Sequence, residues 1–113
     1  KDIYENTGYI LDTHTAVAAG VYNKYKQETN DTQTKTIIAS TASPYKFSRA
    51  VLSAVTGEEI NDTDEFAIVD RLSSLTNTEI PAPLEATRTM EDRFKNLISV
   101  DEMPQYVVNS LEL

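Results

Sequence analysis

Apolar residues along the chain recur mostly at helical spacing, in segments separated by short polar stretches. The clearest segment predicts a helix over residues 44–55, because its apolar positions repeat at i, i+3 and i+4. These positions are Phe47, Ala50, Val51, Ala54 and Val55. Ser43-Pro44 predicts the start of this helix, as an N-cap followed by proline in the first turn. Thr56-Gly57 predicts its end, since glycine readily takes a positive φ.

Four further helices follow from the same spacing. The first runs from an Asp12 or Thr13 cap to about Gln27, and Gly20 within it suggests a close backbone approach. Another runs to about Leu75 from a capping box formed by Asp62 and Glu65. A helix over residues 84–97 follows the connector Ile80–Pro83, and a last one has Asp101 as its cap. The expected inward faces of the three later helices are Phe66, Ile68, Val69, Leu72 and Leu75; Leu84, Met90, Phe94 and Leu97; and Met103, Val107, Val108 and Leu111.

Residues 36–40 differ from the rest, since they are β-branched and apolar in the middle. This composition predicts a short strand covered on both faces. A lone strand cannot form a stable sheet, because its backbone groups would lack ladder partners. The expected fold class is therefore α/β but helix-dominated, with one or two short strands and about five helices. We expect residues 1–57 to be part of an α/β domain and residues 58–113 to be an acidic helical segment.

The chain has 113 residues, no cysteine and a net charge of −8. Residues 1–57 carry six Lys/Arg against five Asp/Glu, a net of +1, and residues 58–113 carry four against thirteen, a net of −9. So acidic a second half disfavours nucleic-acid binding. The longest apolar runs are too short to cross a membrane, and no secretory leader is seen, so we expect a cytoplasmic protein.

Candidate chemistry concentrates at the predicted strand–helix joint. Ser40, Thr41 and Ser43 place three hydroxyls where open α/β sheets bind ligands, although spacing alone favours the simpler explanation of a well-capped strand–helix joint. Lys46 could meet an anionic group there or lie on the surface. His14 is the only histidine, and its place at a helix start favours capping or packing over catalysis. The acidic run over residues 58–65 lacks the glycine and final glutamate of a calcium loop.

Two segments together resemble threonine synthase. They are Gly8-Tyr-Ile-Leu-Asp-Thr-His-Thr-Ala-Val-Ala18 and Ile38-Ala-Ser-Thr-Ala-Ser-Pro-Tyr-Lys-Phe47. That family shows an Asp-Pro-His-Thr-Ala stretch opening one helix and a Thr-Ala-His/Ser-Pro-x-Lys-Phe stretch opening another. Thr13 here replaces the common proline and Ser43 the frequent histidine. The two segments cover about a third of the chain and are similar to the carboxyl-terminal portion of the family.

The resemblance implies a three-layer, tryptophan-synthase-β-like fold that binds pyridoxal 5'-phosphate. The implied reaction converts O-phospho-L-homoserine and water to L-threonine and phosphate. It also implies that Thr41 faces the pyridine nitrogen of the cofactor, with Ser40 and Ser43 as neighbouring candidates. A neutral hydroxyl suits that place because it keeps the ring nitrogen from being strongly protonated. No lysine here lies in a Schiff-base motif, so we expect no catalytic residue in this chain, no tight cofactor binding and no activity of the chain alone.

A second hypothesis is a small acidic helical interaction module with an exposed strand edge. It predicts self-association through the unpaired strand and gives Thr41 no role.

Overall fold

The computed structural model describes residues 1–111 of the chain. Within them the fold is helical. The α-helices are α1 (Asp2–Thr7), α2 (Thr13–Thr29), α3 (Ser48–Thr56), α4 (Glu65–Thr76), α5 (Ala82–Ala86) and α6 (Met103–Ser110). Three short 3-10 helices complete the set: η1 (Pro44–Phe47), η2 (Thr87–Thr89) and η3 (Val100–Glu102).

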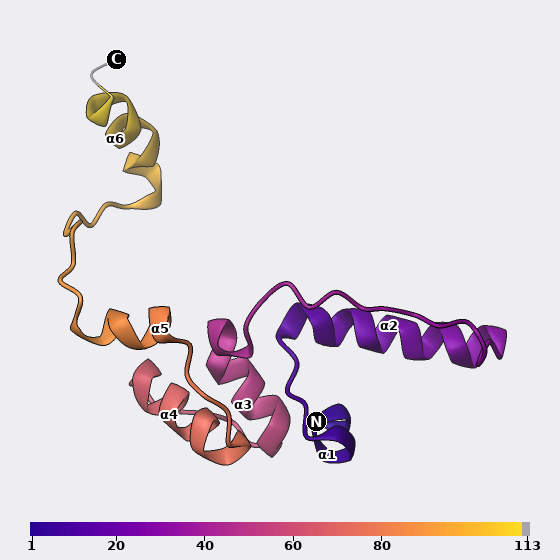
Figure 1. Cartoon of the computed structure of the whole chain (residues 1–113). Helices are drawn as coiled ribbons and strands as arrows, with labels where there is room; N and C mark the ends of the chain where they lie inside the picture. Colours follow the sequence, from indigo (N-terminus) through magenta and orange to yellow (C-terminus); the bar gives the residue numbers. More distant parts are fainter. Residues whose placement is uncertain (112–113) are drawn as a thin grey trace.

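The hydrophobic core lies between α3 and α4, which pack side by side (Figure 1). We call it the α3–α4 core; its buried members are Tyr45, Val51, Leu52, Ile60, Ile68, Val69 and Leu72. The predicted inward positions Val51, Ile68, Val69 and Leu72 are therefore confirmed. The prediction that Phe47 and Leu75 face inwards is wrong for this chain, because Phe47 is 38% exposed and Leu75 is 46% exposed.

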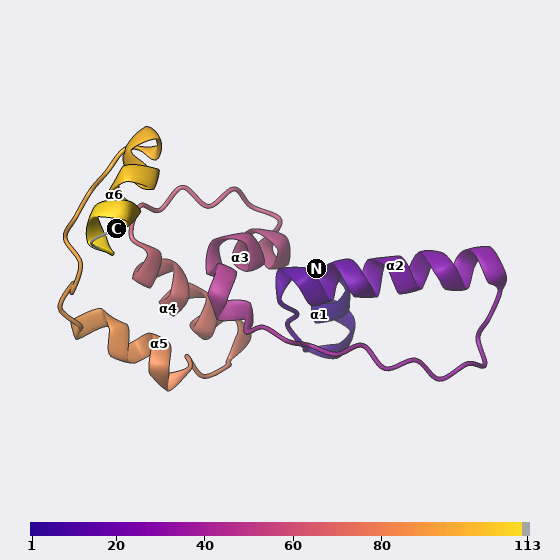
Figure 2. The same cartoon turned by 90° about the horizontal axis from the view of Figure 1, so that it is seen from above.

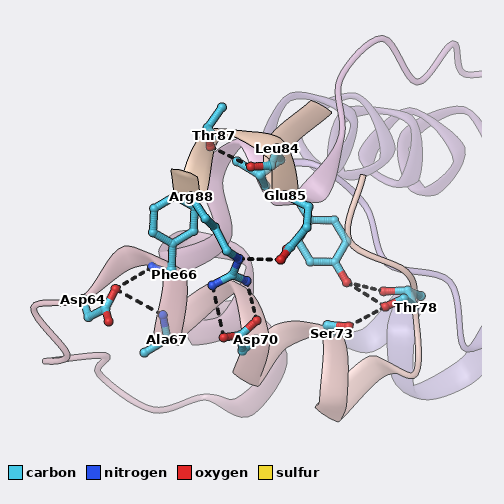
Figure 3. A network of polar contacts seen from close by, with 11 residues as sticks. Asp64, Phe66, Ala67, Asp70, Ser73, Thr78, Leu84, Glu85, Thr87 and Arg88 are labelled. Atoms are coloured by element: carbon cyan, nitrogen blue, oxygen red, sulfur yellow. Dashed lines mark hydrogen bonds and ion pairs between the residues drawn. The ribbon is translucent and has the colours of Figure 1, made fainter. Parts of the chain in front are cut away.

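Local signals placed most helix ends correctly. Asp12 caps α2, and Ser43 caps η1 ahead of Pro44. Gly57 ends α3 with φ +80°, a left-handed conformation that glycine adopts without strain. The cap of α4 is Asp64 rather than Asp62, since the Asp64 carboxylate accepts from the amides of Phe66 and Ala67 (Figure 3). The short helix α1, ended by Gly8, was not predicted.

The predicted strand over residues 36–40 is wrong for the described chain. Residues 1–111 contain no β-strand, and this segment is irregular. Ile37 is 95% exposed rather than covered on both faces. The physical reason is the one that the sequence raised: no other segment of residues 1–111 offers a ladder partner. The α/β class is thus not seen here, and only its helix-dominated part is confirmed.

A guanidinium group fastens α5 and η2 to α4 (Figure 3). Arg88 Nη1 donates to Asp70 Oδ2 at 3.3 Å, and its Nε lies 2.8 Å from Glu85 Oε1. Its Cζ lies 4.7 Å from the centre of the Phe66 ring. The Glu85 and Asp70 carboxylates raise the pKa of Arg88, so the group stays charged. The later half of the predicted helix over 84–97 is wrong, because the chain leaves helical structure after Thr89.

The carboxyl-terminal part of the described chain stands apart from the core. Residues 90–99 are irregular and lead to α6, which lies away from α3 and α4 (Figure 1). Ser99, not Asp101, caps this region, in a capping box with Glu102. The predicted inward face of α6 is exposed at Met103, Val107, Val108 and Leu111. The radius of gyration is 19.4 Å, whereas a compact chain of this length has about 13 Å.

Helix α2 extends far beyond the core (Figure 2). Only Thr15 and Ala19 of this helix are buried, and Val17 and Val21 are 67% and 61% exposed. A Cβ added at Gly20 would meet nothing within 4 Å in the described chain, so the expected close approach has no partner there. No helix within residues 1–111 combines the length and apolarity needed to cross a bilayer.

Candidate functional site

The predicted site lies where the chain returns from the far end of α2 to its first turn. After α2 ends at Thr29, residues 30–42 run as an irregular segment back towards η1 and α3 (Figure 1). A long-range hydrogen bond closes this return: Ser40 Oγ donates to Asp12 Oδ2 at 3.2 Å. The first turn of α2 and Ser40 are therefore neighbours in space, although 28 residues separate Asp12 from Ser40.

Asp12 is the centre of this arrangement and is only 1% exposed. Its Oδ1 accepts from the amides of His14 and Thr15 at 2.9 and 3.1 Å, which caps α2. Its Oδ2 accepts from the hydroxyls of Thr15 and Ser40. The Thr15 hydroxyl lies 3.3 Å from Ser40 Oγ as well, which closes a triangle of polar groups.

The charge on Asp12 is stabilised by these donors. The Thr15 hydroxyl foremost, then the amides of Thr15 and His14 and the Ser40 hydroxyl, lower the pKa of Asp12 to about 2, against the opposing effect of burial. The imidazole Nδ1 of His14 lies 3.7 Å from Asp12 Oδ1. Asp12 is thus an anion held by hydrogen bonds at a helix amino end, where the helix dipole also favours it.

Ser43 fixes the other end of the turn. Its Oγ accepts from the amide of Tyr45 at 3.2 Å and so caps η1. Tyr45 is buried in the α3–α4 core, and its hydroxyl donates to the carbonyl of Thr78 at 3.0 Å. Thr78 in turn accepts from Ser73 on α4 (Figure 3). The turn is therefore joined to α4 as well as to α2.

Thr41 differs from the two serines on either side of it. Ser40 is engaged with Asp12 and Ser43 with the cap of η1. Thr41 is exposed, and within residues 1–111 its hydroxyl makes no hydrogen bond. The Thr41 hydroxyl, which has no structural hydrogen bond within residues 1–111, therefore lies between two serine hydroxyls that each have one.

The charged and aromatic groups near the turn gather on Phe47. The ring centre of His14 lies 5.5 Å from that of Phe47, in a tilted arrangement. Lys46 Nζ lies 5.6 Å from the same ring centre, and the Lys46 side chain is exposed. The packing role expected for His14 is confirmed by this contact. Within residues 1–111 no group of three His, Asp or Glu side chains could hold a metal ion.

Comparison with known proteins shows the family to which the chain belongs. A family model described as "Threonine synthase, C-terminal" matches residues 15–107. The chain belongs to this family. Human threonine synthase-like 1 is 43% identical over 60 residues, which cover 53% of this chain and 8% of that protein. Threonine synthase-like 1 of Mus musculus is 40% identical over 83 residues, which cover 74% of this chain and 10% of that protein. No solved structure matches the chain.

These comparisons confirm the resemblance seen in the sequence. They also show that the chain spans about a tenth of the length of the curated relatives that it matches, or less. The cofactor contacts of Thr41, Ser40 and Ser43 stay predictions, as does the division of the chain at residue 57.

Sequence reasoning missed Thr15 and the second function of Asp12 in this site. Asp12 was predicted as a helix cap and nothing more, and Thr15 was not singled out. The local pattern Asp12-x-x-Thr15 carries the signal for the cap. The second function of the carboxylate, holding Ser40, depends on the return of the chain and has no local signal.

Proposed function

We propose that this chain is the carboxyl-terminal portion of a pyridoxal-phosphate-dependent threonine synthase, and that Thr41 is its contact to the cofactor. In the parent enzyme the substrate would be O-phospho-L-homoserine, converted with water to L-threonine and phosphate. The observation that supports Thr41 is its position. It is an exposed, unengaged hydroxyl in a turn fixed at Ser40 and at Ser43.

The residues of the turn suit the pyridine edge of pyridoxal phosphate. A threonine hydroxyl is neutral and can exchange a single hydrogen bond with a ring nitrogen. Ser40 and Ser43 already have protein partners, which favours Thr41 among the three candidates. The nearby negative charge on Asp12 is enclosed by its own donors, so Thr41 presents a hydroxyl rather than a carboxylate.

Pyridoxal phosphate, when bound, supplies an electron sink for reactions at the α- and β-carbons of an amino acid. Thr41 would orient the ring and hold its nitrogen in a weakly protonated state, which moderates that sink. The reactive lysine and the groups that bind the cofactor phosphate would come from polypeptide beyond these residues. The relatives are several times longer than this chain, because only 60 or 83 aligned residues already make up 8% or 10% of their length, so they leave ample room for these groups. The chain alone would then bind the cofactor weakly and have no activity.

The test replaces Thr41 in the complete protein that carries these residues. We expect Thr41→Val to keep bound cofactor, change its absorption spectrum and lower kcat roughly tenfold, the effect of losing one hydrogen bond of about 1.4 kcal/mol. Thr41→Ser, which keeps the hydroxyl, is the matched control and should stay near the parent rate. Unchanged turnover and spectrum in Thr41→Val would overturn the assignment. A stable cofactor absorption band on the 113-residue chain alone would overturn a different claim, namely that half of the cofactor site lies outside this chain.

A second candidate function is an interaction module, and one observation favours it. Ten of the large apolar residues in the extended part of the chain are exposed: Met90, Phe94, Leu97, Ile98, Val100, Met103, Tyr106, Val107, Val108 and Leu111. Self-association through residues 36–40 remains part of this alternative, although that segment is not a strand here. The Thr41→Val experiment separates the two functions, because a module gives Thr41 no role.

A further inference from the structure

The turn that carries Thr41 lies in a segment without the backbone hydrogen bonding of a helix or a strand. Residues 30–42 form neither helix nor strand, and apart from Asp31 and Ile38 the residues from 30 to 41 are exposed. A hydroxyl that serves a ring nitrogen must stay within hydrogen-bond reach of it, about 2.6–3.2 Å. Such accuracy on an irregular segment requires an anchor from a rigid element.

We propose that Asp12 is that anchor, a positioning residue that places the Thr41 turn for the cofactor. This inference rests on the proposed function of Thr41. Asp12 caps α2, the longest helix of the described chain, and Ser40 directly precedes Thr41. The hydrogen bond from Ser40 to Asp12 therefore transmits the position of a helix end to the neighbouring residue.

The two carboxylate oxygens divide the work. Oδ1 serves the helix, since it accepts from the amides of His14 and Thr15. Oδ2 faces the turn and accepts from the hydroxyls of Ser40 and Thr15. A residue that only capped α2 would need the first oxygen alone. The second oxygen is what makes the link between segments 28 residues apart.

The burial of Asp12 makes this link selective. At 1% exposure the carboxylate has almost no access to water, so it depends on protein donors such as the Ser40 hydroxyl for its hydrogen bonds. Thr15, itself buried, contacts both Asp12 and Ser40 and supports the same geometry. The turn is then fixed at Ser40 by α2 and at Ser43 by η1, with Thr41 between the two fixed points.

Two variants separate the anchor from the helix cap. Asp12→Ser keeps a good cap for α2, because serine caps about as well as aspartate, but it lacks the second oxygen that holds Ser40. Ser40→Ala removes the link from the other side and leaves the cap of α2 intact; it alters an exposed residue, so we expect it to fold. Asp31→Ser is the matched control. Asp31 also organises a loop, by accepting from the amides of Gln33 and Thr34, but it touches none of the residues of the turn.

The first measurement uses the 113-residue chain and needs no cofactor. Backbone order parameters from NMR relaxation should be those of a rigid segment at residues 40–43 in the parent and in Asp31→Ser. In Asp12→Ser and Ser40→Ala they should fall towards the flexible range, below about 0.6. Unchanged order parameters in both variants would overturn the proposal, whatever Thr41 does in the enzyme.

The second measurement uses the complete protein with pyridoxal phosphate bound. Ser40→Ala and Asp12→Ser should shift the cofactor spectrum and lower kcat in the same direction as Thr41→Val, whereas Asp31→Ser should not. If Asp12 acts through Thr41, adding Ser40→Ala to Thr41→Val should cost little more than Thr41→Val alone. Fully additive losses would overturn the positioning role and leave the function of Thr41 standing. A Thr41→Val variant with parent activity would overturn both the cofactor contact of Thr41 and the positioning role of Asp12. The order parameters would then report only on the hydrogen bond between Ser40 and Asp12.

Discussion

Replacing Leu72 by alanine tests whether the α3–α4 core is what holds this chain together. Leu72 lies on α4 and is completely buried, in the same cluster as Leu52 of α3. The substitution removes three carbon atoms, which corresponds to about 2.4 kcal/mol at about 0.8 kcal/mol each. The cavity left behind adds to this, so we expect a total loss of about 3–4 kcal/mol in the free energy of unfolding.

That loss is large for so small a core. Domains of this size are stable by roughly 5–15 kcal/mol, and an α3–α4 core of seven buried hydrophobic residues places the chain at the lower end. Urea denaturation followed by far-ultraviolet circular dichroism should show a midpoint lowered by about 1.5 M or more. Should the variant unfold without urea, the same titration in a stabilising osmolyte such as trimethylamine N-oxide brings the transition into range.

The matched control is Leu75→Ala on the same helix. Leu75 is 46% exposed, so the substitution loses about half of the transfer free energy and leaves no enclosed cavity, about 1 kcal/mol in all. The sequence pattern alone predicts equal burial for Leu72 and Leu75. Equal losses for the two variants would contradict the packing described here, as would a loss below about 1 kcal/mol for Leu72→Ala.

Two further predictions concern charged groups. Arg88→Lys keeps the positive charge but cannot contact Asp70, Glu85 and the Phe66 ring together. The denaturation midpoint should therefore fall, by less than in Leu72→Ala. A midpoint unchanged from the parent, as expected for the control Arg93→Lys, would refute a stabilising role of the Arg88 contacts. Asp12, through the Thr15 hydroxyl above all, and Asp31, through the Thr34 amide above all, have pKa values lowered from 3.8 to about 2. Their stabilising effect is therefore complete above pH 3.8 and is lost as the pH falls from there to about 2. Denaturation midpoints measured between pH 5 and pH 2 should fall less steeply in Asp12→Ser than in the parent, and an identical slope would count against the ionised carboxylate.

The helix ends show how far local chemistry reaches. Asp12, Ser43 and Gly57 act within their own turns, through hydrogen bonds to nearby amides or through a positive φ. Such effects depend on a few neighbouring residues, so the sequence predicts them. Where two local signals compete, as Asp62 and Asp64 do before α4, the spacing alone selected the wrong carboxylate.

The strand over residues 36–40 shows the opposite case. β-Branched residues favour a strand, yet a strand exists only where another segment pairs with it. No segment of residues 1–111 does so, and Ile37 is left exposed. The same holds for the apolar face of α6, since a helix pattern predicts which side would be buried but not whether anything covers it.

By itself, then, the sequence determined the family, most of the helices and the three hydroxyls of the turn, because each depends on residues close together along the chain. The tertiary structure decided which hydroxyl is free. Ser40 is engaged because the chain returns to Asp12, 28 residues away, and the Tyr45 that follows Ser43 is anchored at Thr78, 33 residues away. Contacts at such separations depend on the path of the whole chain, and no local pattern of residues encodes them.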